Sequence, residues 1–261
     1  MKLAIAQIKH GQNKKENLDK ILSAIKRYGL GSDLILFPET CMGVKTDSVS
    51  LSDMAEDIDK GEFITEVRKA CEEAGVHACV CLWEKTAAEK VYNTAVVVAP
   101  DGGTKAVYRK LHLFDALSVK ESDDMIAGSI LPQEFEVCGV RCSLGICYDL
   151  RFPEVFRGAA LSGVQLFLVP AAWYSGEHKL HHLKTLLSAR ALENTAYFAC
   201  ADICGGSFSG HSAVYSPFGL CETEAGTDEC VVYADIDVDK VSSVREVLPC
   251  LENLSAIFKK V

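Results

Sequence analysis

The chain alternates between short apolar runs and longer segments in which apolar residues recur every three or four positions. Apolar runs of strand length predict β-strands, and the helical spacing predicts amphipathic helices. The predicted strands are residues 2–8, 34–39, 77–83, 93–100, 141–147, 164–170, 196–202, 210–216 and 230–236. The predicted helices are residues 14–28, 62–74, 153–162, 178–193 and 239–246. This alternation indicates an α/β fold.

Most of the predicted strands are apolar along their whole length, which is typical of sheets covered on both faces. Two pairs of consecutive strands, 77–83 with 93–100 and 210–216 with 230–236, have no helical segment between them. We therefore expect mixed sheets, because parallel neighbours need a long crossover. No linker rich in Ser, Gly or Pro, no repeat and no low-complexity tract interrupts the chain. The sequence thus predicts one domain over residues 1–261.

Composition and charge narrow the class of protein. The 261 residues are 49% hydrophobic and carry a net charge of −9, which supports a large core and argues against nucleic acid as a partner. The apolar run before Lys9 is too short for a signal peptide, and no segment approaches the roughly 20 apolar residues of a membrane span. We expect a cytoplasmic protein with no membrane partner.

The twelve cysteines are expected to be free thiols in that reducing compartment. There is no CxxC pair, so a structural zinc site is disfavoured. His178 and His182 share a helix face in HKLHH (178–182). However, no HExxH motif and no evident third ligand accompany them, so we predict no metal site.

Three polar residues follow apolar segments. Glu39 ends LILFPE, Lys110 follows AVYR and Cys147 ends RCSLGIC. Polar residues at the carboxyl ends of strands are where α/β proteins usually build sites. Each also has a structural explanation: a cap or ion pair for Glu39, a solvated side chain for Lys110 and a small buried hydrophobe for Cys147.

The surroundings of Cys147 favour a chemical role. The next residues, YDLRFPE, are too polar to continue a buried strand, and a helix is predicted from residue 153. A thiol near a helix N-terminus meets the positive end of the helix dipole and free N–H groups, which favour the reactive thiolate. The same N–H groups can stabilise an oxyanion. The junction therefore predicts a nucleophile.

Three segments resemble the nitrilase superfamily of carbon–nitrogen hydrolases: FPET (37–40), YRKLHLFD (108–115) and GICYDLRFPE (145–154). The segments ARALEN (189–194) and GHSAVYSPFG (210–219) are also similar, so the resemblance reaches from AIAQI to about residue 237. It implies a four-layer αββα sandwich with two mixed β-sheets. It also implies a homodimer or higher homo-oligomer, because subunits of this superfamily commonly pair.

The resemblance further implies that Glu39, Lys110 and Cys147 form a catalytic triad, with Glu121 of KESDDMIAG as a second glutamate. In that scheme Cys147 attacks an amide carbonyl and Glu39 transfers protons. Lys110 and the backbone N–H of Tyr148 stabilise the oxyanion, and Glu121 orients Lys110 or the substrate. The scheme uses no metal and no organic cofactor. His112, within KLHLF, is interpreted as structural rather than as a base.

The residues after Cys147 bear on the substrate. CYDLRFPE is similar to the ω-amidase and deaminated-glutathione amidase branches, whereas carbamoylputrescine branches tend to read CWDQWFPE. Arg151 falls where relatives that use acid substrates hold a carboxylate, which a guanidinium grips with two bonds. The alternative for Arg151 is an ion pair with Glu154 or Asp149. We expect a small carboxylic acid with a terminal amide, such as 2-oxoglutaramate or 2-oxosuccinamate.

Several other functions stay open. A deaminated-glutathione amidase, an N-carbamoyl amidohydrolase and a nitrilase share the same chemistry. A glutaminase module would need a synthetase domain, and lipid-directed acyltransferases of the superfamily carry membrane spans. The intact set of Glu39, Lys110 and Cys147 disfavours a non-enzymatic scaffold.

Overall fold

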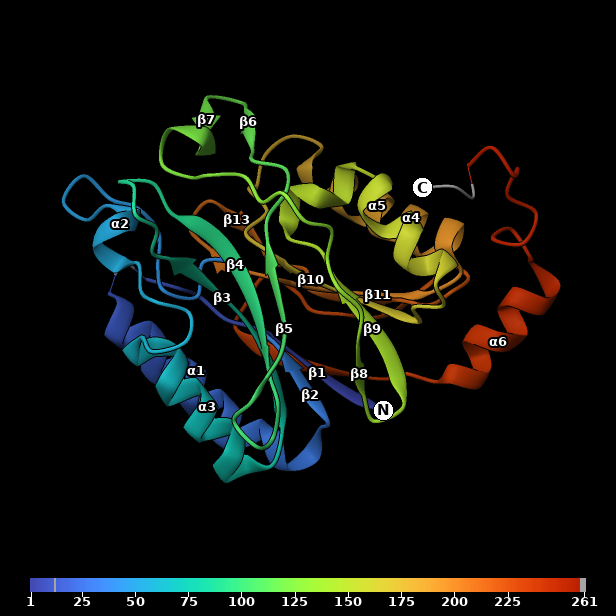
Figure 1. Ribbon diagram of the computed structural model, residues 1–261, viewed down its shortest axis with the longest axis horizontal. Coiled ribbons are helices and arrows are strands. Elements are labelled where there is room, and N and C mark those ends of the chain that lie inside the picture. The colour runs from blue at the N-terminus through green and yellow to red at the C-terminus, as the bar shows by residue number, and fades with distance from the viewer. Residues whose placement is uncertain (12, 259–261) are drawn as a thin grey trace.

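The computed structural model describes residues 1–11 and 13–258, and within them two six-stranded sheets pack face to face between layers of helices (Figure 1). The first sheet has the order β16 (Cys230–Asp235), β1 (Lys2–Gln7), β2 (Leu34–Leu36), β3 (His77–Glu84), β4 (Tyr92–Val98) and β5 (Thr104–Arg109). The second has the order β15 (Cys221–Glu224), β14 (Ala213–Tyr215), β11 (Tyr197–Asp202), β10 (Leu166–Ala171), β9 (Val140–Leu144) and β8 (Phe135–Val137).

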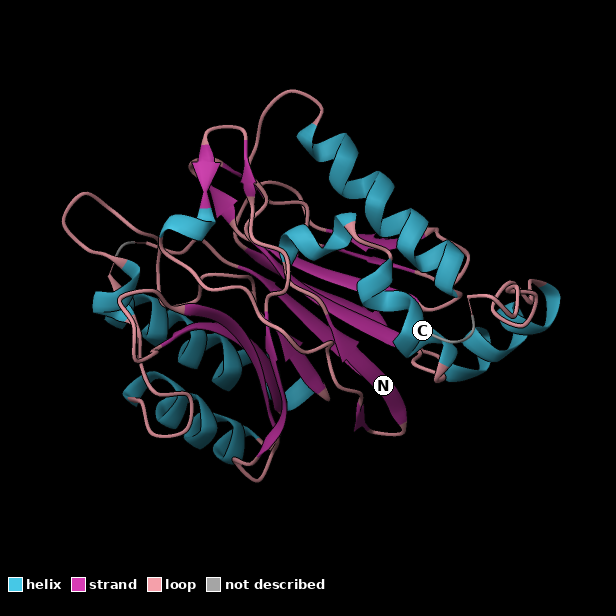
Figure 2. Ribbon diagram, turned by 45° about the horizontal axis from the view of Figure 1, so that its top comes forward, coloured by secondary structure: helices cyan, strands magenta, loops and turns pink. Residues whose placement is uncertain are grey.

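Helices cover the outer faces of this sandwich, as Figure 2 shows. The first sheet is covered by α1 (Lys14–Tyr28) and α3 (Glu62–Ala74), and the second by α4 (Glu154–Leu161) and α5 (Lys179–Asn194). The remaining helices are α2 (Leu51–Met54), α6 (Val238–Val247) and the short 3-10 helices η1 (Gly29–Gly31), η2 (Glu121–Asp123) and η3 (Cys147–Arg151). Two small hairpins are formed by β6 (Asp115–Ala116) with β7 (Val119–Lys120) and by β12 (Cys204–Gly205) with β13 (Phe208–Ser209).

Both sheets are mixed. Strands β1, β2 and β3 run parallel, whereas β3, β4 and β5 are antiparallel. In the second sheet β9, β10 and β11 are parallel, β8 and β14 pair antiparallel with β9 and β11, and β15 pairs antiparallel with β14. The predicted αββα fold with two mixed sheets is confirmed.

Alternation along the strands divides the core into layers. Leu3 and Ile5 of β1 lie in the cluster that contains the apolar residues of β10 and β11. Their neighbours Ala4 and Ala6 pack with Ile21 of α1 on the other face. Because successive side chains of a strand point to opposite faces, a continuously apolar strand serves two cores.

Helix boundaries follow from local chemistry. The side chain of Asn13 accepts hydrogen bonds from the N–H groups of Lys15 and Glu16, which starts α1 at Lys14. Gly75 ends α3 in the left-handed conformation with φ 64°, which costs glycine no steric strain. The predicted ranges 14–28 and 62–74 match these two helices.

The strands predicted at 210–216 and 230–236 are not partners. The first becomes β14 in the second sheet, and the second becomes β16 at the edge of the first sheet. The unpredicted strand β15 lies between them and forms the hairpin with β14. The chain then crosses to the other sheet, where β16 pairs with β1. Among the described helices, none combines the length and hydropathy that a membrane span requires.

Candidate active site

The predicted triad residues come from both sheets. Glu39 follows β2, Lys110 directly follows β5, and Cys147 begins η3 shortly after β9. The backbone N–H of Glu39 donates to the carbonyl oxygen of Ala171 at the end of β10, at 3.2 Å. This bond joins the two sheets at their carboxyl edge, so residues far apart in sequence reach one place.

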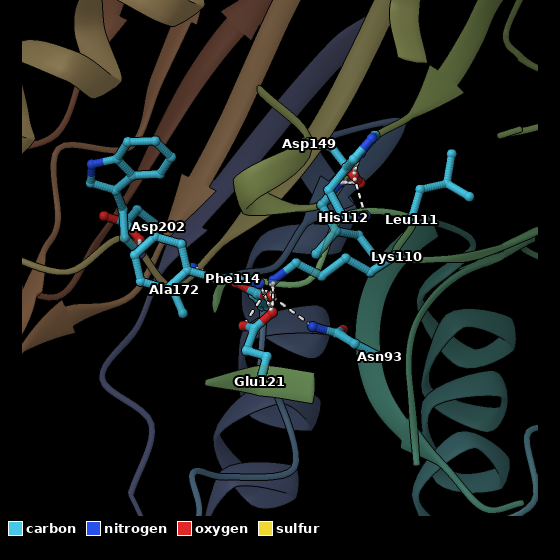
Figure 3. Close-up of polar contacts among 12 residues, drawn as sticks. Asn93, Lys110, Leu111, His112, Phe114, Glu121, Asp149, Ala172 and Asp202 are labelled. Carbon is cyan, nitrogen blue, oxygen red and sulfur yellow. Dashed lines mark hydrogen bonds and ion pairs between the residues drawn. The ribbon is translucent and has the colours of Figure 1, made fainter. Parts of the chain in front are cut away.

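Lys110 lies between two carboxylates. Its Nζ is 2.9 Å from Glu39 Oε1 and 2.9 Å from Glu121 Oε1. Figure 3 shows the side chains of Lys110, Glu121 and Asn93 pointing toward one another. The side chain of Lys110 has no exposed surface, and burial alone disfavours its charge. The two carboxylates outweigh burial and raise the pKa of Lys110 well above its usual value, so the buried side chain is an ammonium.

Both carboxylates are fixed by further donors. Asn93 Nδ2 donates to Glu39 Oε1 at 2.6 Å, and the Ala172 N–H donates to Oε2 at 2.9 Å. Glu121 Oε2 accepts from the Phe114 N–H at 2.7 Å. Burial raises the pKa of Glu121, Lys110 opposes that shift, and Glu39 adds to it. The cluster therefore has a permanent cation and two carboxyl groups that compete for it.

Cys147 occupies a strained and buried position. Its φ of +45° is in the left-handed region, as is the φ of +58° at Thr40, next to Glu39. Such non-glycine conformations cost about 1–3 kcal/mol each and cluster at functional sites. Only 8% of Cys147 is exposed.

The surroundings of Cys147 oppose the thiolate form that the sequence was expected to favour. Cys147 begins a 3-10 helix, and the longer helix α4 starts only at Glu154. Burial, followed by the negative charge of Glu39, raises the pKa of Cys147 well above its usual value, and Lys110 only partly opposes this. The sulfur is a neutral thiol near neutral pH, so its activation requires a base.

Asp149 connects the lysine segment to the cysteine turn. Its Oδ2 accepts bonds from the Tyr108 hydroxyl at 2.7 Å and from the Ile146 N–H at 3.0 Å. Its Oδ1 accepts from the backbone N–H of His112 at 3.1 Å and lies 2.8 Å from His112 Nδ1. The His112 ring stacks on Phe152 with ring centroids 3.6 Å apart. His112 thus orients the site from outside, in agreement with the structural role predicted for it.

Two adjoining cavities lead to the thiol. The inner one is lined by Cys147, Glu121, Ala172 and Trp173, and the outer one, of about 690 Å³, extends to Arg151. Four residues line both cavities: Phe114, Tyr148, Tyr174 and Lys179. The thiol therefore lies at the closed end of a pocket with aromatic walls.

Arg151 does not form the ion pair considered as its structural alternative. Among the described residues no ion pair joins it to Glu154 or Asp149, and Asp149 binds other donors. The guanidinium carbon lies 5.2 Å from the ring centroid of Trp173 and 5.9 Å from that of Tyr148. Arg151 therefore faces the outer cavity with its charge unneutralised.

The sequence did not identify several residues of the site. Asn93 opens the predicted strand 93–100, and a polar residue at the start of an apolar run was a usable signal; in the structure its exposure is 1%. Phe114 and Ala172 contribute through their backbone N–H groups, which do not depend on residue type, so the sequence could not reveal them. Lys179 lies within HKLHH (178–182), where the histidines suggested a metal site and the lysine did not stand out. In the structure, His178 lies 3.1 Å from Glu177. Within residues 1–11 and 13–258, no three His, Cys, Asp or Glu side chains form a group able to hold a metal ion.

Comparison with known proteins identifies the family. The sequence profile described as Carbon-nitrogen hydrolase matches residues 2–246. This chain belongs to the carbon–nitrogen hydrolase family. The enzyme is accordingly a hydrolase that acts on carbon–nitrogen bonds, as predicted from its sequence.

Individual relatives are similar over almost the whole chain. A deaminated glutathione amidase from Escherichia coli O157:H7 is 32% identical over 236 residues, which cover 90% of each chain. The omega-amidase NIT2 of Mus musculus is 31% identical over 266 residues, covering 98% of this enzyme and 95% of that protein. The crystal structure of an amidase from Nesterenkonia sp. superposes with a TM-score of 0.80 at 28% identity, covering 95% of each chain. That amidase is a member of the nitrilase superfamily, so the predicted superfamily is confirmed.

Proposed function

We propose that this enzyme is an amidase of the ω-amidase type, which cleaves the terminal amide of a small carboxylic acid to the free acid and ammonia. The observation that carries the proposal is the buried Lys110 ammonium held by Glu39 and Glu121 beside a cavity lined by Cys147. This arrangement supplies a nucleophile, a base and an electrophilic cation beside one cavity.

In the first half-reaction, Cys147 Sγ attacks the amide carbonyl carbon while Glu39 takes the thiol proton. The raised pKa of Cys147 makes this transfer necessary. The new S–C bond turns the carbonyl oxygen into an oxyanion, which the Lys110 ammonium and the backbone N–H of Tyr148 stabilise. The first N–H groups of a helix have no partner within it, and Tyr148 is the second residue of η3.

Collapse of this intermediate breaks the C–N bond. Glu39 returns its proton to the leaving nitrogen, ammonia departs, and a thioester remains on Cys147. Glu39 then takes a proton from water as the oxygen attacks the thioester, again through an oxyanion next to Lys110. When the S–C bond breaks, the sulfur regains the proton from Glu39 and the acid is released.

Glu121 serves as the positioning carboxylate in this scheme. It is held by the Phe114 N–H and in turn holds Lys110, so the ammonium keeps its place when Glu39 becomes protonated. Glu121 also lines the inner cavity, where it can contact the substrate amide.

A carboxylate on the substrate is favoured by the unpaired Arg151 in the outer cavity. A molecule with an amide at one end and a carboxylate at the other can place its amide at Cys147 and its acid toward Arg151. Both 2-oxoglutaramate and 2-oxosuccinamate have this form, and an omega-amidase and a deaminated glutathione amidase are among the relatives. The deaminated-glutathione amidase activity is the second candidate, because the outer cavity of about 690 Å³ also admits a longer acid.

Ammonia release tests the proposal. The enzyme is incubated with 2-oxoglutaramate, a simple aliphatic amide, an N-carbamoyl amino acid and an aliphatic nitrile, and separately with deaminated glutathione. For deaminated glutathione the released amine is measured, because its amide nitrogen leaves as an amine and not as ammonia. We expect the fastest ammonia release from 2-oxoglutaramate and none from the Cys147→Ala variant. Absence of a product from every compound would contradict catalysis and favour a scaffold function.

Three features stay predictions. The homodimer follows only from the resemblance, the cytoplasmic location from the lack of a signal-peptide pattern and of a long apolar segment in the sequence, and the single domain over 1–261 from the absence of a linker pattern. Sedimentation velocity measures the first directly, since a dimer has twice the mass of the 28.4 kDa chain.

A further inference from the structure

Lys179 is a buried lysine at the start of α5, outside the predicted triad. Its residue surface is 7% exposed, and its ammonium lies 5.0 Å from the ring centroid of Phe114 and 4.9 Å from that of Trp173. Two aromatic faces thus form a cage around the charge, an arrangement that stabilises a cation and fixes its position.

The charge of Lys179 is not neutralised by the protein. Among the described residues neither Lys179 nor Arg151 forms an ion pair with a carboxylate. Of the acidic groups around them, Glu121 binds Lys110 and Glu177 is exposed. Asp202 accepts a bond from the Trp173 N–H at Oδ1, its buried Oδ2 has no hydrogen-bond partner, and burial raises its pKa well above the usual value, which favours the neutral acid over a counter-ion. A buried charge without a counter-ion is costly, and a ligand of opposite charge removes that cost.

The two cations face a common space. Lys179 lines both the inner cavity, which contains Cys147, and the outer cavity, whereas Arg151 lines the outer cavity. Both lie close to the Trp173 ring, at 4.9 and 5.2 Å from its centroid. Lys179 is therefore at the junction through which the far end of a substrate must extend when its amide lies at Cys147.

His182, one turn further along α5, also lines the outer cavity. Burial and the charges of Arg151 and Lys179 lower its pKa, so it adds no third charge near neutral pH. Burial and the charge of Arg151 lower the pKa of Lys179 as well. An anion placed between Lys179 and Arg151 favours the charged form of both.

We infer that Lys179 is a specificity-determining residue, which together with Arg151 holds the carboxylate of the substrate at the junction of the two cavities. This inference rests on the proposed function and narrows its substrate class to short acids that carry an amide at the other end. Because Lys179 is near the thiol cavity, it contacts an acid separated from the amide by only a few carbons. In a protein of net charge −9, this pair also creates a local positive field that attracts anions.

The test compares an acid with its neutral analogue. Glutaramate and pentanamide present the same amide on a chain of the same length, ending in a carboxylate or a methyl group. Lys179→Met keeps the apolar length that packs on Phe114 and Trp173 but removes the charge, and Lys179→Arg keeps the charge. Lys184→Met is the matched control, because Lys184 is on the same helix but pairs with Glu224 at 2.7 Å.

We expect Lys179→Met to lower kcat/KM for glutaramate by about 10- to 100-fold, the range expected for one hydrogen bond to a charged group. Activity on pentanamide should stay within about 2-fold, since it makes no such bond. Lys179→Arg should recover most of the loss, and Lys184→Met should behave as the wild type. Equal losses for both amides, or no loss for either, would overturn the role of Lys179.

A second measurement is independent of turnover. The product-like dianion glutarate should protect Cys147 from alkylation by iodoacetamide, followed on the Cys147 peptide by mass spectrometry. Lys179→Met should raise the glutarate concentration needed for half protection by about 10-fold or more, and Lys179→Arg should not. If glutarate does not protect the wild type, or protects all variants equally, the inference fails even where amide hydrolysis is established. If the wild type binds glutarate through Lys179 but hydrolyses no amide, the proposed function fails instead.

Discussion

The hydroxyl of Tyr108 donates a 2.7 Å hydrogen bond to Asp149 Oδ2. Tyr108 belongs to β5, which ends just before Lys110, and Asp149 belongs to the 3-10 helix that begins at Cys147. Since the same carboxylate also accepts from the N–H of Ile146, it fixes the cysteine turn relative to the lysine strand. The spacing between the Cys147 thiol and the Lys110 ammonium thus depends on Asp149, which contacts neither of them.

Tyr108→Phe tests this connection. The change removes one bond to a buried carboxylate, which should lower the free energy of unfolding by about 1–2 kcal/mol. Because the cysteine turn loses an anchor, kcat should fall more than KM rises. Denaturant unfolding and steady-state ammonia release measure the two effects. Tyr233→Phe in β16, where the residue is 40% exposed, is the control, and an unchanged kcat in Tyr108→Phe would contradict the positioning role.

Glu39→Gln should leave the protein folded but block turnover. The amide retains the shape of the side chain, and Lys110 keeps Glu121 as a partner, so thermal unfolding should still be cooperative. Gln cannot accept the thiol proton, and loss of a general base costs about 100- to 10,000-fold in rate. Ammonia release in the steady state is the measurement, with Glu229→Gln, from a surface pair with Lys20, as the control. Normal turnover in Glu39→Gln would refute its role as the base.

Arg151→Ala should raise KM for acidic amides far more than for neutral ones. The guanidinium lies in the outer cavity without an ion pair, so its removal affects the carboxylate and not the thiol. We expect kcat/KM for 2-oxoglutaramate to fall by about 10-fold or more, which is the effect of losing one hydrogen bond to a charged group. Parallel kinetics with a neutral amide decide the case, because equal effects on both substrates would make Arg151 structural.

The strands that the sequence predicted are those that contain a run of apolar residues. β3, with every residue buried, and β10 were recognised because their whole length is apolar. The strands of the two six-stranded sheets that were missed, β5, β8 and β15, are all edge strands. Edge strands face solvent and carry polar residues, as CETE of β15 does, so an apolar pattern does not reveal them.

The site was predictable in part because its residues end strands. Glu39, Lys110 and Cys147 follow apolar segments, and the resemblance added Glu121, which the structure brings into contact with Lys110. The hydrogen bond from the Ala172 N–H to Glu39 forms where the two sheets meet, and it does not depend on residue type. The aromatic cage of Lys179 has the same origin, since Phe114 and Trp173 are far apart in the chain and meet only in the folded protein.

His10 gives the fold a defined sensitivity to acid. Its residue surface is 7% exposed, and burial, followed by the charge of Lys20, lowers its pKa from 6.5 to about 4. Between these values the unfolded chain binds a proton that the folded chain does not bind. The contribution of neutral His10 to the free energy of unfolding is therefore fully present above pH 6.5 and is lost as the pH falls toward about 4.

His10→Leu should flatten this part of the stability profile. Leucine binds no proton, so between about pH 7.5 and about pH 4.5 the wild type should lose about 2 kcal/mol more than the variant. Urea unfolding at both pH values gives the two free energies, and the comparison of losses cancels any constant effect of the packing change. His181→Leu, at an exposed position of α5, should keep the slope of the wild type. If His10→Leu keeps that slope too, His10 is protonated equally in the folded and unfolded chains and burial does not control its pKa.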